Sequence, residues 1–420
     1  MTRSTCTLRL VASISALLLG AACGSSDDSP GASASTTEPA PEASAPADPT
    51  TTVAPTTTEP APPTTEAAPP VSTEPPAPDL ELIEDGPYDV GVTTITIDDP
   101  DGERPLTVDV WFPLADGTAD LSPQQYTLLP GVYYESPDAF AATPDLIATD
   151  EEFPLVVYSH GSGGLRYIHS AYTEAIASHG YVVAAPDHTG NTAVDRLLGA
   201  EFAGELTAFL RPNDVSRVID AFTDPSHPSA GPWAEQVDAE RIAVTGHSFG
   251  GFTSVAVVTG FSNVNGTFEA DDRVDAIIPL APATGPALLA DEVISLVDVP
   301  MMVIVGTDDV TTPVEPNVTR LWDLNDNSPA YRAELVAGEH QTFTDLCAYT
   351  RFLPQLTDVP QAVLDTIEAS AVEGCSEGDM DDGRAADLTN TYAVAFLDQV
   401  FRDGEPIIAT HPGDVIFQSR

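Results

Sequence analysis

No lysine occurs in the 420-residue chain, and its 15 basic residues are all arginine, against 65 aspartates and glutamates. The formal net charge of −50 should repel nucleic acids and anionic lipid surfaces, so we expect neither as a partner. Cysteine is scarce as well, with four residues in the whole chain. Only two cysteines follow residue 23, and no histidines cluster near them, so the sequence predicts no metal site and no cofactor.

The N-terminal apolar stretch, Leu10–Leu19, is shorter than the ~20 residues that span a bilayer. Two arginines precede it and small residues follow it, which is the arrangement of an export signal. The ending Leu-Gly-Ala-Ala-Cys23 resembles a bacterial lipoprotein signal, in which the cysteine becomes the lipidated N-terminus. We therefore predict a lipoprotein signal peptide at residues 1–23, with Cys23 anchoring the protein to the membrane outside the cytoplasm. The alternative is a secretory signal cleaved near Ala22.

Residues 24–80 are mostly Ser, Thr, Pro, Ala and Glu, with nine acidic and no basic residues. Such a composition cannot bury a core, so we expect a disordered linker that holds the following domain away from the membrane. The pattern changes at about residue 81, and residues 81–420 are long enough for one large domain.

Alternating strand and helix patterns fill this domain. A βαβ series of this kind predicts an α/β fold, a doubly wound and mostly parallel sheet of about eight strands. The first two expected strands alternate apolar residues with polar ones, so we predict an antiparallel pair at the sheet edge. The expected strands are Val92–Ile97, Leu106–Phe112, Phe153–Tyr158, Tyr181–Ala185, Ile242–Val244, Ile277–Leu280, Met301–Val305 and Ala333–Val336.

The strand at Ile242–Val244 leads into Gly246-His-Ser248-Phe-Gly250-Gly, which matches the G-x-S-x-G nucleophile elbow. A strand-to-helix turn this tight needs glycine two residues before and two residues after the serine, because side chains there would clash. The serine hydroxyl then stands exposed above the sheet, so Ser248 is the predicted nucleophile. The alternative is a glycine-rich turn whose serine caps the next helix.

Two later strands end in residues that suit the partners of such a serine. Met301–Val305 is followed by Gly306, Asp308, Asp309 and Pro313. In hydrolases of this type the acid usually lies three residues after the glycine and four before the proline, which selects Asp309; Asp308 is the alternative. The last expected strand leads to His340, which completes the order Ser…Asp…His that this fold imposes and is the predicted base.

The strand at Phe153–Tyr158 ends in Ser159-His160-Gly161-Ser162-Gly-Gly. In hydrolases with the elbow, this loop gives the second backbone N–H of the oxyanion hole. We therefore predict that the main chains of Ser162 and Phe249 bind the oxyanion, with His160 as a positioning residue beneath the loop. Residues 188–212 and 261–275 are the expected pocket walls.

Cys347 and Cys375 follow the histidine loop in a domain that we expect to be exported, where oxidation is favoured. A disulfide between them would close a loop of about 28 residues, worth roughly 3–4 kcal/mol, and would pin the segment that carries His340. The acidic stretch Glu377–Asp387 could attract Ca²⁺, but it lacks the EF-hand spacing, and a solvated loop is the preferred interpretation.

With these motifs in place, residues 88–405 resemble an α/β-hydrolase, more narrowly the bacterial platelet-activating-factor acetylhydrolase-like and dienelactone-hydrolase-like esterases. The resemblance implies Ser248 as nucleophile, His340 as base and the backbones of Ser162 and Phe249 as oxyanion donors. In the animal acetylhydrolases the acid follows the strand before Met301, whereas here that segment has no acid, so Asp309 has to serve, as in dienelactone hydrolase and the cutinase-like polyester hydrolases. The stretches that carry the resemblance are Phe153–Arg166, Ala177–His188, Arg211–Asp220, Gly246–Gly251 and Glu339–Asp345.

The leading interpretation is an exported serine carboxylic-ester hydrolase acting on lipid-like or short-chain acyl esters, with a polyester hydrolase as the alternative. A serine peptidase of the prolyl-oligopeptidase type shares the elbow and the residue order, and a binding lipoprotein on an inactive hydrolase scaffold is a third hypothesis. Inactive scaffolds usually lose a member of the triad, and none is missing from this sequence. The oligomeric state is not readable from the residues.

Overall fold

The structure is a computed structural model that describes residues 79–420, apart from residues 100, 101, 103, 119, 130, 150, 230, 232, 357, 358, 408 and 409. The predicted signal peptide, the lipidation site Cys23 and nearly all of the predicted linker lie outside the described residues. These assignments, and the domain boundary at about residue 81, remain predictions.

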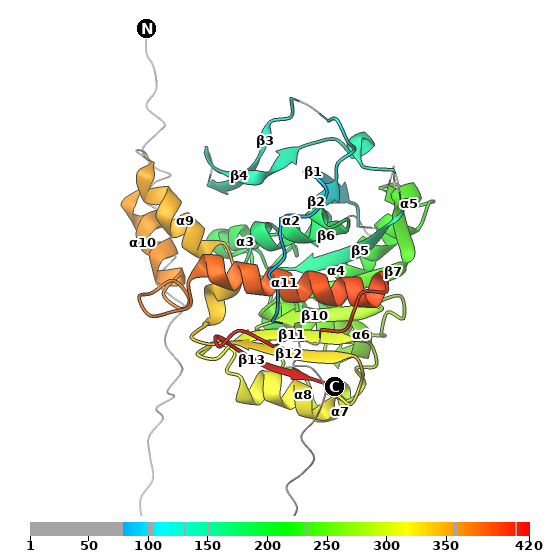
Figure 1. Cartoon of the computed structure of the whole chain (residues 1–420), viewed down its shortest axis with the longest axis vertical. Coiled ribbons are helices and arrows are strands. Elements are labelled where there is room, and N and C mark those ends of the chain that lie inside the picture. Colours follow the sequence, from blue (N-terminus) through cyan, green and yellow to red (C-terminus); the bar gives the residue numbers. More distant parts are fainter. Residues whose placement is uncertain are drawn as a thin grey trace, which may run out of the picture. The chain divides into compact units, whose positions relative to one another are not determined.

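A large mixed sheet organises the described residues (Figure 1). Its eleven strands are ordered β13-β12-β11-β10-β7-β5-β6-β2-β1-β4-β3, and β8 and β9 form a separate hairpin. The strands are β1 (Val90–Ile97), β2 (Leu106–Pro113), β3 (Pro123–Leu129), β4 (Val132–Ala141), β5 (Phe153–Ser159), β6 (Val182–Pro186), β7 (Val237–His247), β8 (Phe261–Asn263), β9 (Gly266–Phe268), β10 (Ala276–Leu280), β11 (Met301–Gly306), β12 (Ala330–Leu335) and β13 (Val415–Ser419).

The central strands β6, β5, β7, β10, β11 and β12 run parallel to one another, which confirms the predicted α/β fold class. Every strand expected from the sequence is present, but the sheet is wider than the eight strands predicted because β3, β4 and β13 join it. The antiparallel pair β1–β2 forms with Ile97 opposite Leu106, yet its placement at the sheet edge is wrong. Strand β4 pairs with β1 on the outer side, and β3 forms that edge.

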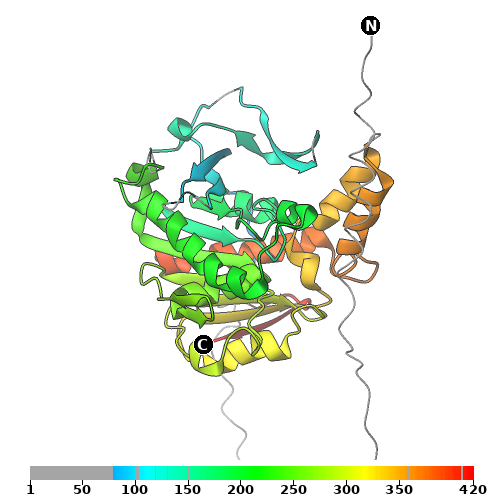
Figure 2. The same cartoon turned by 180° about the vertical axis from the view of Figure 1, so that it is seen from behind.

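Helices cover both faces of the sheet. Helices α2 and α11 pack together on one face, and α4 and α6 pack together on the other (Figures 1 and 2). The helices are α2 (Ser170–Ser178), α3 (Ala193–Leu198), α4 (Gly204–Thr223), α5 (Trp233–Gln236), α6 (Phe249–Thr259), α7 (Asp291–Ile294), α8 (Arg320–Leu324), α9 (Leu346–Phe352), α10 (Gln361–Ser370) and α11 (Asp382–Phe401), with the 3₁₀ turns η1 (Pro144–Leu146), η3 (His340–Phe343) and η4 (Leu353–Gln355) and the π turn η2 (Glu315–Thr319).

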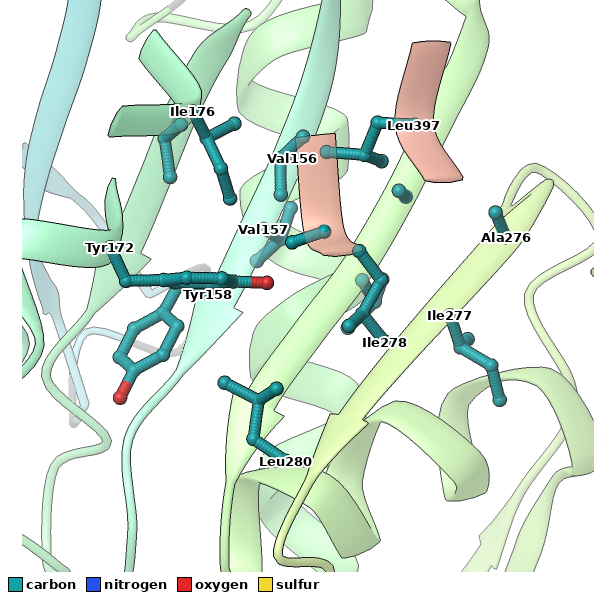
Figure 3. Packing of buried hydrophobic residues seen from close by; sticks show 14 of the residues in the cluster. Val156, Val157, Tyr158, Tyr172, Ile176, Ala276, Ile277, Ile278, Leu280 and Leu397 are labelled. Atoms are coloured by element: carbon teal, nitrogen blue, oxygen red, sulfur yellow. The ribbon is translucent and has the colours of Figure 1, made fainter. Parts of the chain in front are cut away.

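The core lies between these layers. Strands β5, β6, β10 and β11 are buried along their whole length, since helices cover them from both sides, and this explains their uninterrupted apolar runs. Tyr172 and Ile176 of α2 and Leu397 of α11 belong to the same buried cluster as Val156 and Ile278 (Figure 3). Each such side chain contributes roughly 1.5–3 kcal/mol by leaving water, so the sheet is a rigid base for the loops at its ends.

A buried carboxyl group fastens the outer hairpin β3–β4 to α2. Tyr126 of β3 and Ser136 of β4 donate hydrogen bonds to Glu174, at 2.6 and 2.9 Å, and the Trp111 indole donates to the Tyr126 hydroxyl at 2.8 Å. Burial raises the pKa of Glu174 to about 8, against the lowering effect of these two bonds. The hairpin therefore depends on a carboxyl group that prefers to stay protonated near neutral pH.

In the part of the chain that the structure describes, no helix is both long and apolar enough to cross a membrane.

Candidate active site

The predicted nucleophile lies on a sharp turn between β7 and α6. Ser248 has backbone angles of φ 58° and ψ −113°, a conformation that an L-residue rarely adopts. A Cβ atom at Gly246 would lie 2.4 Å from the carbonyl oxygen of Ser159, and one at Gly250 only 1.7 Å from it. The close approach of β5 therefore explains why glycine occupies both positions.

The alternative role for the serine, capping α6, does not fit its contacts. The Ser248 side chain makes no hydrogen bond to the first turn of the helix. Its Oγ lies 2.9 Å from Nε2 of His340 instead, and the residue is half-buried, so solvent and small molecules reach it.

The three predicted triad residues meet above the carboxyl ends of parallel strands. His340 follows β12 and begins the turn η3, and Asp309 follows β11. The Nδ1 atom of His340 lies 2.9 Å from Oδ2 of Asp309. The serine hydroxyl, the imidazole and the carboxylate thus form one continuous hydrogen-bonded line, of which only the Ser248 end is open.

A threonine that the sequence analysis did not single out holds the acid in place. The N–H of Thr312 donates to Oδ1 of Asp309 at 2.6 Å, and its hydroxyl lies 2.7 Å from Oδ2 and 2.9 Å from the carbonyl oxygen of Ala281. Burial by itself would raise the pKa of Asp309, but the bonds from His340 and Thr312 outweigh it and hold the pKa below its ordinary value. This carboxyl group is therefore ionised at neutral pH, as the partner of an imidazolium must be.

The rival acid, Asp308, points elsewhere. Its side chain is exposed, and it accepts a hydrogen bond from the hydroxyl of Thr307 at 2.8 Å. Asp309 is only 4% exposed and contacts the imidazole directly, so the geometry favours Asp309.

The loop after β5 lies against the nucleophile. A Cβ atom at Gly161 would be 3.5 Å from Cβ of Ser248. The carbonyl oxygen of Gly161 accepts hydrogen bonds from Nδ1 of His160, at 2.7 Å, and from the N–H of Gly164, at 3.0 Å. Since a trans peptide is planar, fixing this carbonyl also fixes the N–H of Ser162 in the opposite direction. Within the described chain neither this N–H nor that of Phe249 is bonded to another group.

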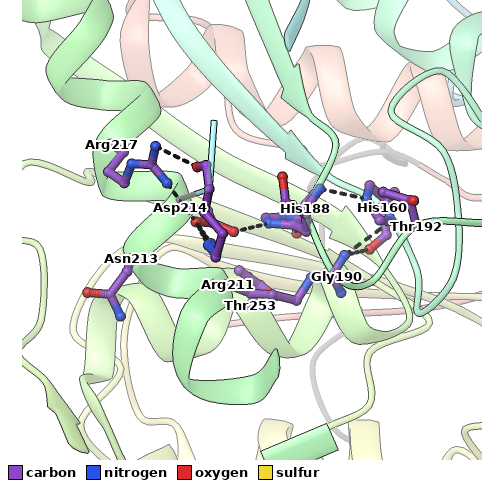
Figure 4. Close-up of polar contacts among 12 residues, drawn as sticks. His160, His188, Gly190, Thr192, Arg211, Asn213, Asp214, Arg217 and Thr253 are labelled. Atoms are coloured by element: carbon purple, nitrogen blue, oxygen red, sulfur yellow. Dashed lines mark hydrogen bonds and ion pairs between the residues drawn. The ribbon is translucent and has the colours of Figure 1, made fainter. Parts of the chain in front are cut away.

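A buried polar network supports this loop from below (Figure 4). The main-chain N–H of His188 donates to Nε2 of His160 at 3.2 Å, so the proton of His160 must be on Nδ1. The imidazole of His188 lies between Asp214, at 3.0 Å, and the hydroxyl of Ser159, at 2.9 Å. Burial and the nearby charge of Arg211 hold the pKa values of His160 and His188 well below the ordinary value, so both rings stay neutral.

Arg211 of α4 connects this network to the second predicted oxyanion donor. Its guanidinium group donates to the main-chain carbonyl of His160, and its central carbon lies 5.1 Å from the ring centroid of Phe249. The predicted role of His160 beneath the loop agrees with these contacts. The sequence did not predict that His188, Arg211 and Asp214 support this loop. His188 and Arg211 lie in the expected wall segment 188–212, and Asp214 lies just after it.

His247, the variable residue of the elbow pattern, contacts the base. Its Nε2 lies 2.9 Å from the main-chain carbonyl oxygen of His340, and the two rings are 4.6 Å apart. Burial lowers the pKa of His247 well below its ordinary value, so the neutral ring donates one hydrogen bond to this carbonyl. No role was predicted for His247, because the elbow pattern accepts any residue at this position.

Two segments that we expect to form pocket walls make contacts near the elbow. Asn191 donates to the hydroxyl of Ser162 at 3.3 Å, and the guanidinium of Arg196 covers Gly163. Phe261 packs edge-on against Phe252 of α6, with ring centroids 5.2 Å apart, whereas the end of the same segment lies beside β7, where the N–H of Asp275 donates to the carbonyl oxygen of Ile242 at 2.8 Å. The lining of the substrate pocket by residues 188–212 and 261–275 remains a prediction.

The disulfide Cys347–Cys375 is formed, and it joins α9 to the segment between α10 and α11. The acidic stretch 377–387 is only partly a loop, because α11 begins at Asp382 with Asp381 as its N-cap. Among the described residues, no group of three or more His, Cys, Asp or Glu side chains could hold a metal ion.

Comparisons with known proteins agree with this architecture. The family model of platelet-activating factor acetylhydrolase, isoform II, matches residues 126–201, a segment that includes the predicted oxyanion loop but none of the predicted triad positions. Platelet-activating factor acetylhydrolase of cattle (Bos taurus) is 24% identical over 306 residues, which cover 64% of this chain and 61% of that protein. The chicken (Gallus gallus) protein of the same name is 32% identical over 147 residues, 25% of this chain and 35% of its own length. The matched region thus covers less than two thirds of the length of each of these relatives.

Among solved structures, a ferulic acid esterase from Streptomyces cinnamoneus aligns with 82% of this chain and all of its own, with a TM-score of 0.57 and 24% identity. That likeness shows the fold. Together with the parallel sheet and the elbow, these findings show the α/β-hydrolase fold, and over part of its length the chain is similar to platelet-activating factor acetylhydrolases.

Proposed function

We propose that the protein is an exported serine esterase in which Ser248 attacks the carbonyl carbon of a carboxylic ester. The observation that carries the proposal is the hydrogen-bonded line from Ser248 through His340 to Asp309 at a sharp strand-to-helix turn. The matched relatives are named as acetylhydrolases and as an esterase, and this agrees with ester cleavage.

In the acylation step His340 is the base. Its Nε2 accepts the proton of the Ser248 hydroxyl as Oγ bonds to the ester carbon, and Asp309 stabilises the imidazolium that results. The carbonyl oxygen gains a negative charge, which the N–H groups of Ser162 and Phe249 stabilise. The imidazolium then returns its proton to the leaving alcohol, and the acyl group remains on Ser248.

Water completes the cycle by the same route. His340 takes a proton from the water that attacks the acyl carbon, and the carboxylic acid leaves as Ser248 recovers its proton. No other group needs to titrate.

We propose lipid-like or short-chain acyl esters as substrates, because acetylhydrolases of platelet-activating factor are the matched relatives. A polyester hydrolase is the second candidate, favoured by an acid that follows β11, the position that cutinase-like polyester hydrolases share with dienelactone hydrolase. A serine peptidase would share the triad, so the assay has to include peptides.

A panel of p-nitrophenyl esters of increasing chain length, a polyester film and a peptide panel distinguish these substrates. The wild-type protein should cleave the esters, and Ser248→Ala should lower kcat by roughly 10⁴–10⁶ with substrate binding nearly unchanged. A fluorophosphonate probe should label the wild type and not the variant. Equal labelling of the two proteins contradicts the assignment of Ser248.

Export and lipid anchoring by Cys23 belong to the same proposal. Two or more acyl chains on this cysteine would hold the enzyme at the membrane, since one chain binds only marginally. Mass spectrometry of the mature N-terminus tests it: a lipidated Cys23 is expected, and an unmodified N-terminus at or beyond Ala22 would make the protein a freely secreted esterase.

A further inference from the structure

Glu373 lies between α10 and α11, far from the triad in sequence, but it contacts the loop that carries the predicted acid. One of its carboxylate oxygens accepts the main-chain N–H groups of Val310 and Thr311, at 2.8 and 2.9 Å. The other accepts the hydroxyl of Thr311 at 2.7 Å. A single side chain therefore satisfies the two N–H groups that directly follow Asp309.

This arrangement leaves Asp309 available for the base. The N–H groups of Val310, Thr311 and Thr312 follow one another, and two carboxylates share them: Glu373 takes the first two, and Asp309 takes the third. Without Glu373, these two exposed N–H groups would lose the acceptor that holds them, and the loop that carries Asp309 would lose its tie to the segment after α10. The oxygen of Asp309 that now binds His340 would then lose its fixed direction.

The same residue contacts the loop of the base through its main chain. The carbonyl oxygen of Glu373 accepts the N–H of Gln341, the residue after His340, at 2.7 Å. The next residue, Gly374, has a φ of 131°, and a Cβ atom there would lie 2.6 Å from the main-chain nitrogen of Thr342. The contact is therefore backbone against backbone and leaves no room for adjustment.

The disulfide holds this segment in place. Cys375 comes two residues after Glu373, and its bond to Cys347 ties the segment to α9, which follows the histidine loop. Glu373 thus lies on a covalently fastened segment that contacts both the acid loop and the base loop.

We propose that Glu373 is a positioning residue that fixes Asp309 against His340, with the Cys347–Cys375 disulfide as its support. The proposal rests on the proposed esterase function, because only that function gives the Asp309–His340 contact a role in catalysis. It predicts that substitutions at Glu373 act on kcat, through Asp309, and leave KM nearly unchanged.

Three substitutions separate the hydrogen bonds from the charge. Glu373→Ala removes both acceptors and should lower kcat about 10- to 100-fold. Glu373→Asp is one methylene shorter and should resemble Ala. Glu373→Gln keeps an oxygen for the two N–H groups, and its amide can donate to Thr311, so its kcat should lie within about 3-fold of the wild type. Each kcat is calculated from the concentration of active sites, measured as the amount of Ser248 that reacts with fluorophosphonate. Unfolded protein therefore does not lower the measured kcat.

A double-mutant cycle tests whether Glu373 acts through the acid. In an Asp309→Asn background, Glu373→Ala should cost less than about 3-fold further, since the interaction that it supports is already lost. The matched control is Glu368→Gln, which removes the charge of an exposed carboxylate from α10, the helix that precedes Glu373. Its kcat should equal that of the wild type. The Cys347→Ser/Cys375→Ser pair should lower kcat in the same direction as Glu373→Ala.

The outcomes are separate for the two proposals. If the wild type cleaves no ester, the proposed function fails. If the wild type is active and Glu373→Ala keeps its kcat, or if the losses from Glu373→Ala and Asp309→Asn multiply in full, the positioning role of Glu373 is overturned.

Discussion

The replacement of Asp309 by asparagine examines the proposed mechanism most directly, because the structure fixes which way the new amide must point. The N–H of Thr312 donates to Oδ1 of Asp309 and can only donate, so the amide oxygen of the asparagine has to take that position. The amide NH₂ then takes the position of Oδ2, which faces Nδ1 of His340. An NH₂ group can only donate, so Nδ1 becomes an acceptor and the proton of the neutral ring moves to Nε2.

That tautomer cannot accept the proton of Ser248. We expect Asp309→Asn to lower kcat by about 10⁴, the loss seen when a triad acid is replaced in this way. This is about 5.4 kcal/mol in the activation free energy, at 1.36 kcal/mol for each factor of ten. The change hardly alters volume, and Asp309 is buried behind His340, so KM should stay within about 3-fold of the wild type.

The neighbouring carboxylate supplies the control. The side chain of Asp308 is exposed and accepts a hydrogen bond from the adjacent Thr307, so Asp308→Asn should change kcat less than about 2-fold. Hydrolysis of p-nitrophenyl butyrate, followed at several substrate concentrations, measures both variants. An Asp309→Asn variant with more than a tenth of the wild-type kcat refutes the reasoning, and a reversed ranking of the two variants moves the acid to Asp308.

Three further changes follow from single contacts. Gly250→Ala should lower the free energy of unfolding by on the order of 4 kcal/mol or more and leave little soluble protein, because its Cβ atom would lie 1.7 Å from a backbone oxygen. Gly204→Ala, where nothing lies within 4 Å, is the control. A normal melting temperature for Gly250→Ala contradicts the described geometry of the elbow. Thr312→Val should lower kcat about 10-fold, because it removes the hydrogen bond between the Thr312 hydroxyl and Asp309. Thr312→Ser keeps a hydroxyl and should retain the wild-type kcat. Equal rates for the two variants would show that the hydroxyl does not contribute. Burial raises the pKa of Glu174 to about 8, so the folded protein binds more protons than the unfolded chain between about pH 4.5 and 8. Stability should therefore fall as pH rises through that window, and the melting temperature of Glu174→Gln should fall less over the same range. If the melting temperatures of the two proteins change in parallel with pH, Glu174 does not titrate there.

The central strands were predictable because both faces of the sheet are covered. A strand buried on both faces must be apolar throughout, and Met301–Gly306 shows this in its sequence. Strand β3 forms the edge and β4 lies beside it, both are only partly buried, and β4 contains a proline, so they carry neither an apolar run nor a clear alternation. Only the finished sheet, and the bonds from Tyr126 and Ser136 to Glu174, define them as strands.

The three residues that meet in the candidate site, Ser248, Asp309 and His340, were predictable for a different reason. A nucleophile on this kind of turn requires glycines at set positions, and the order of the strands then limits where an acid and a histidine can follow. Thr312, His247 and Glu373 have no such constraint, since each acts through a contact that exists only after distant segments meet. Glu373 lies 64 positions after Asp309 in the chain, and neither its type nor its neighbours distinguishes it from the other acidic residues.

The position of the acid bears on how much the relatives reveal about substrate. The resemblance implies that animal acetylhydrolases carry their acid after the strand that corresponds to β10, where this chain has Ala281. Here the hydroxyl of Thr312 lies between the carbonyl oxygen of Ala281, at 2.9 Å, and Oδ2 of Asp309, at 2.7 Å, so this segment borders an acid from the next strand instead of supplying one. Strands β10 and β11 are parallel neighbours that end at the same edge, and a carboxylate from either can therefore reach one imidazole. The proposed ester chemistry depends on that shared edge and tolerates the exchange of strands, whereas the loops that surround it, and with them the choice of acyl group and alcohol, are free to differ from those of the acetylhydrolases.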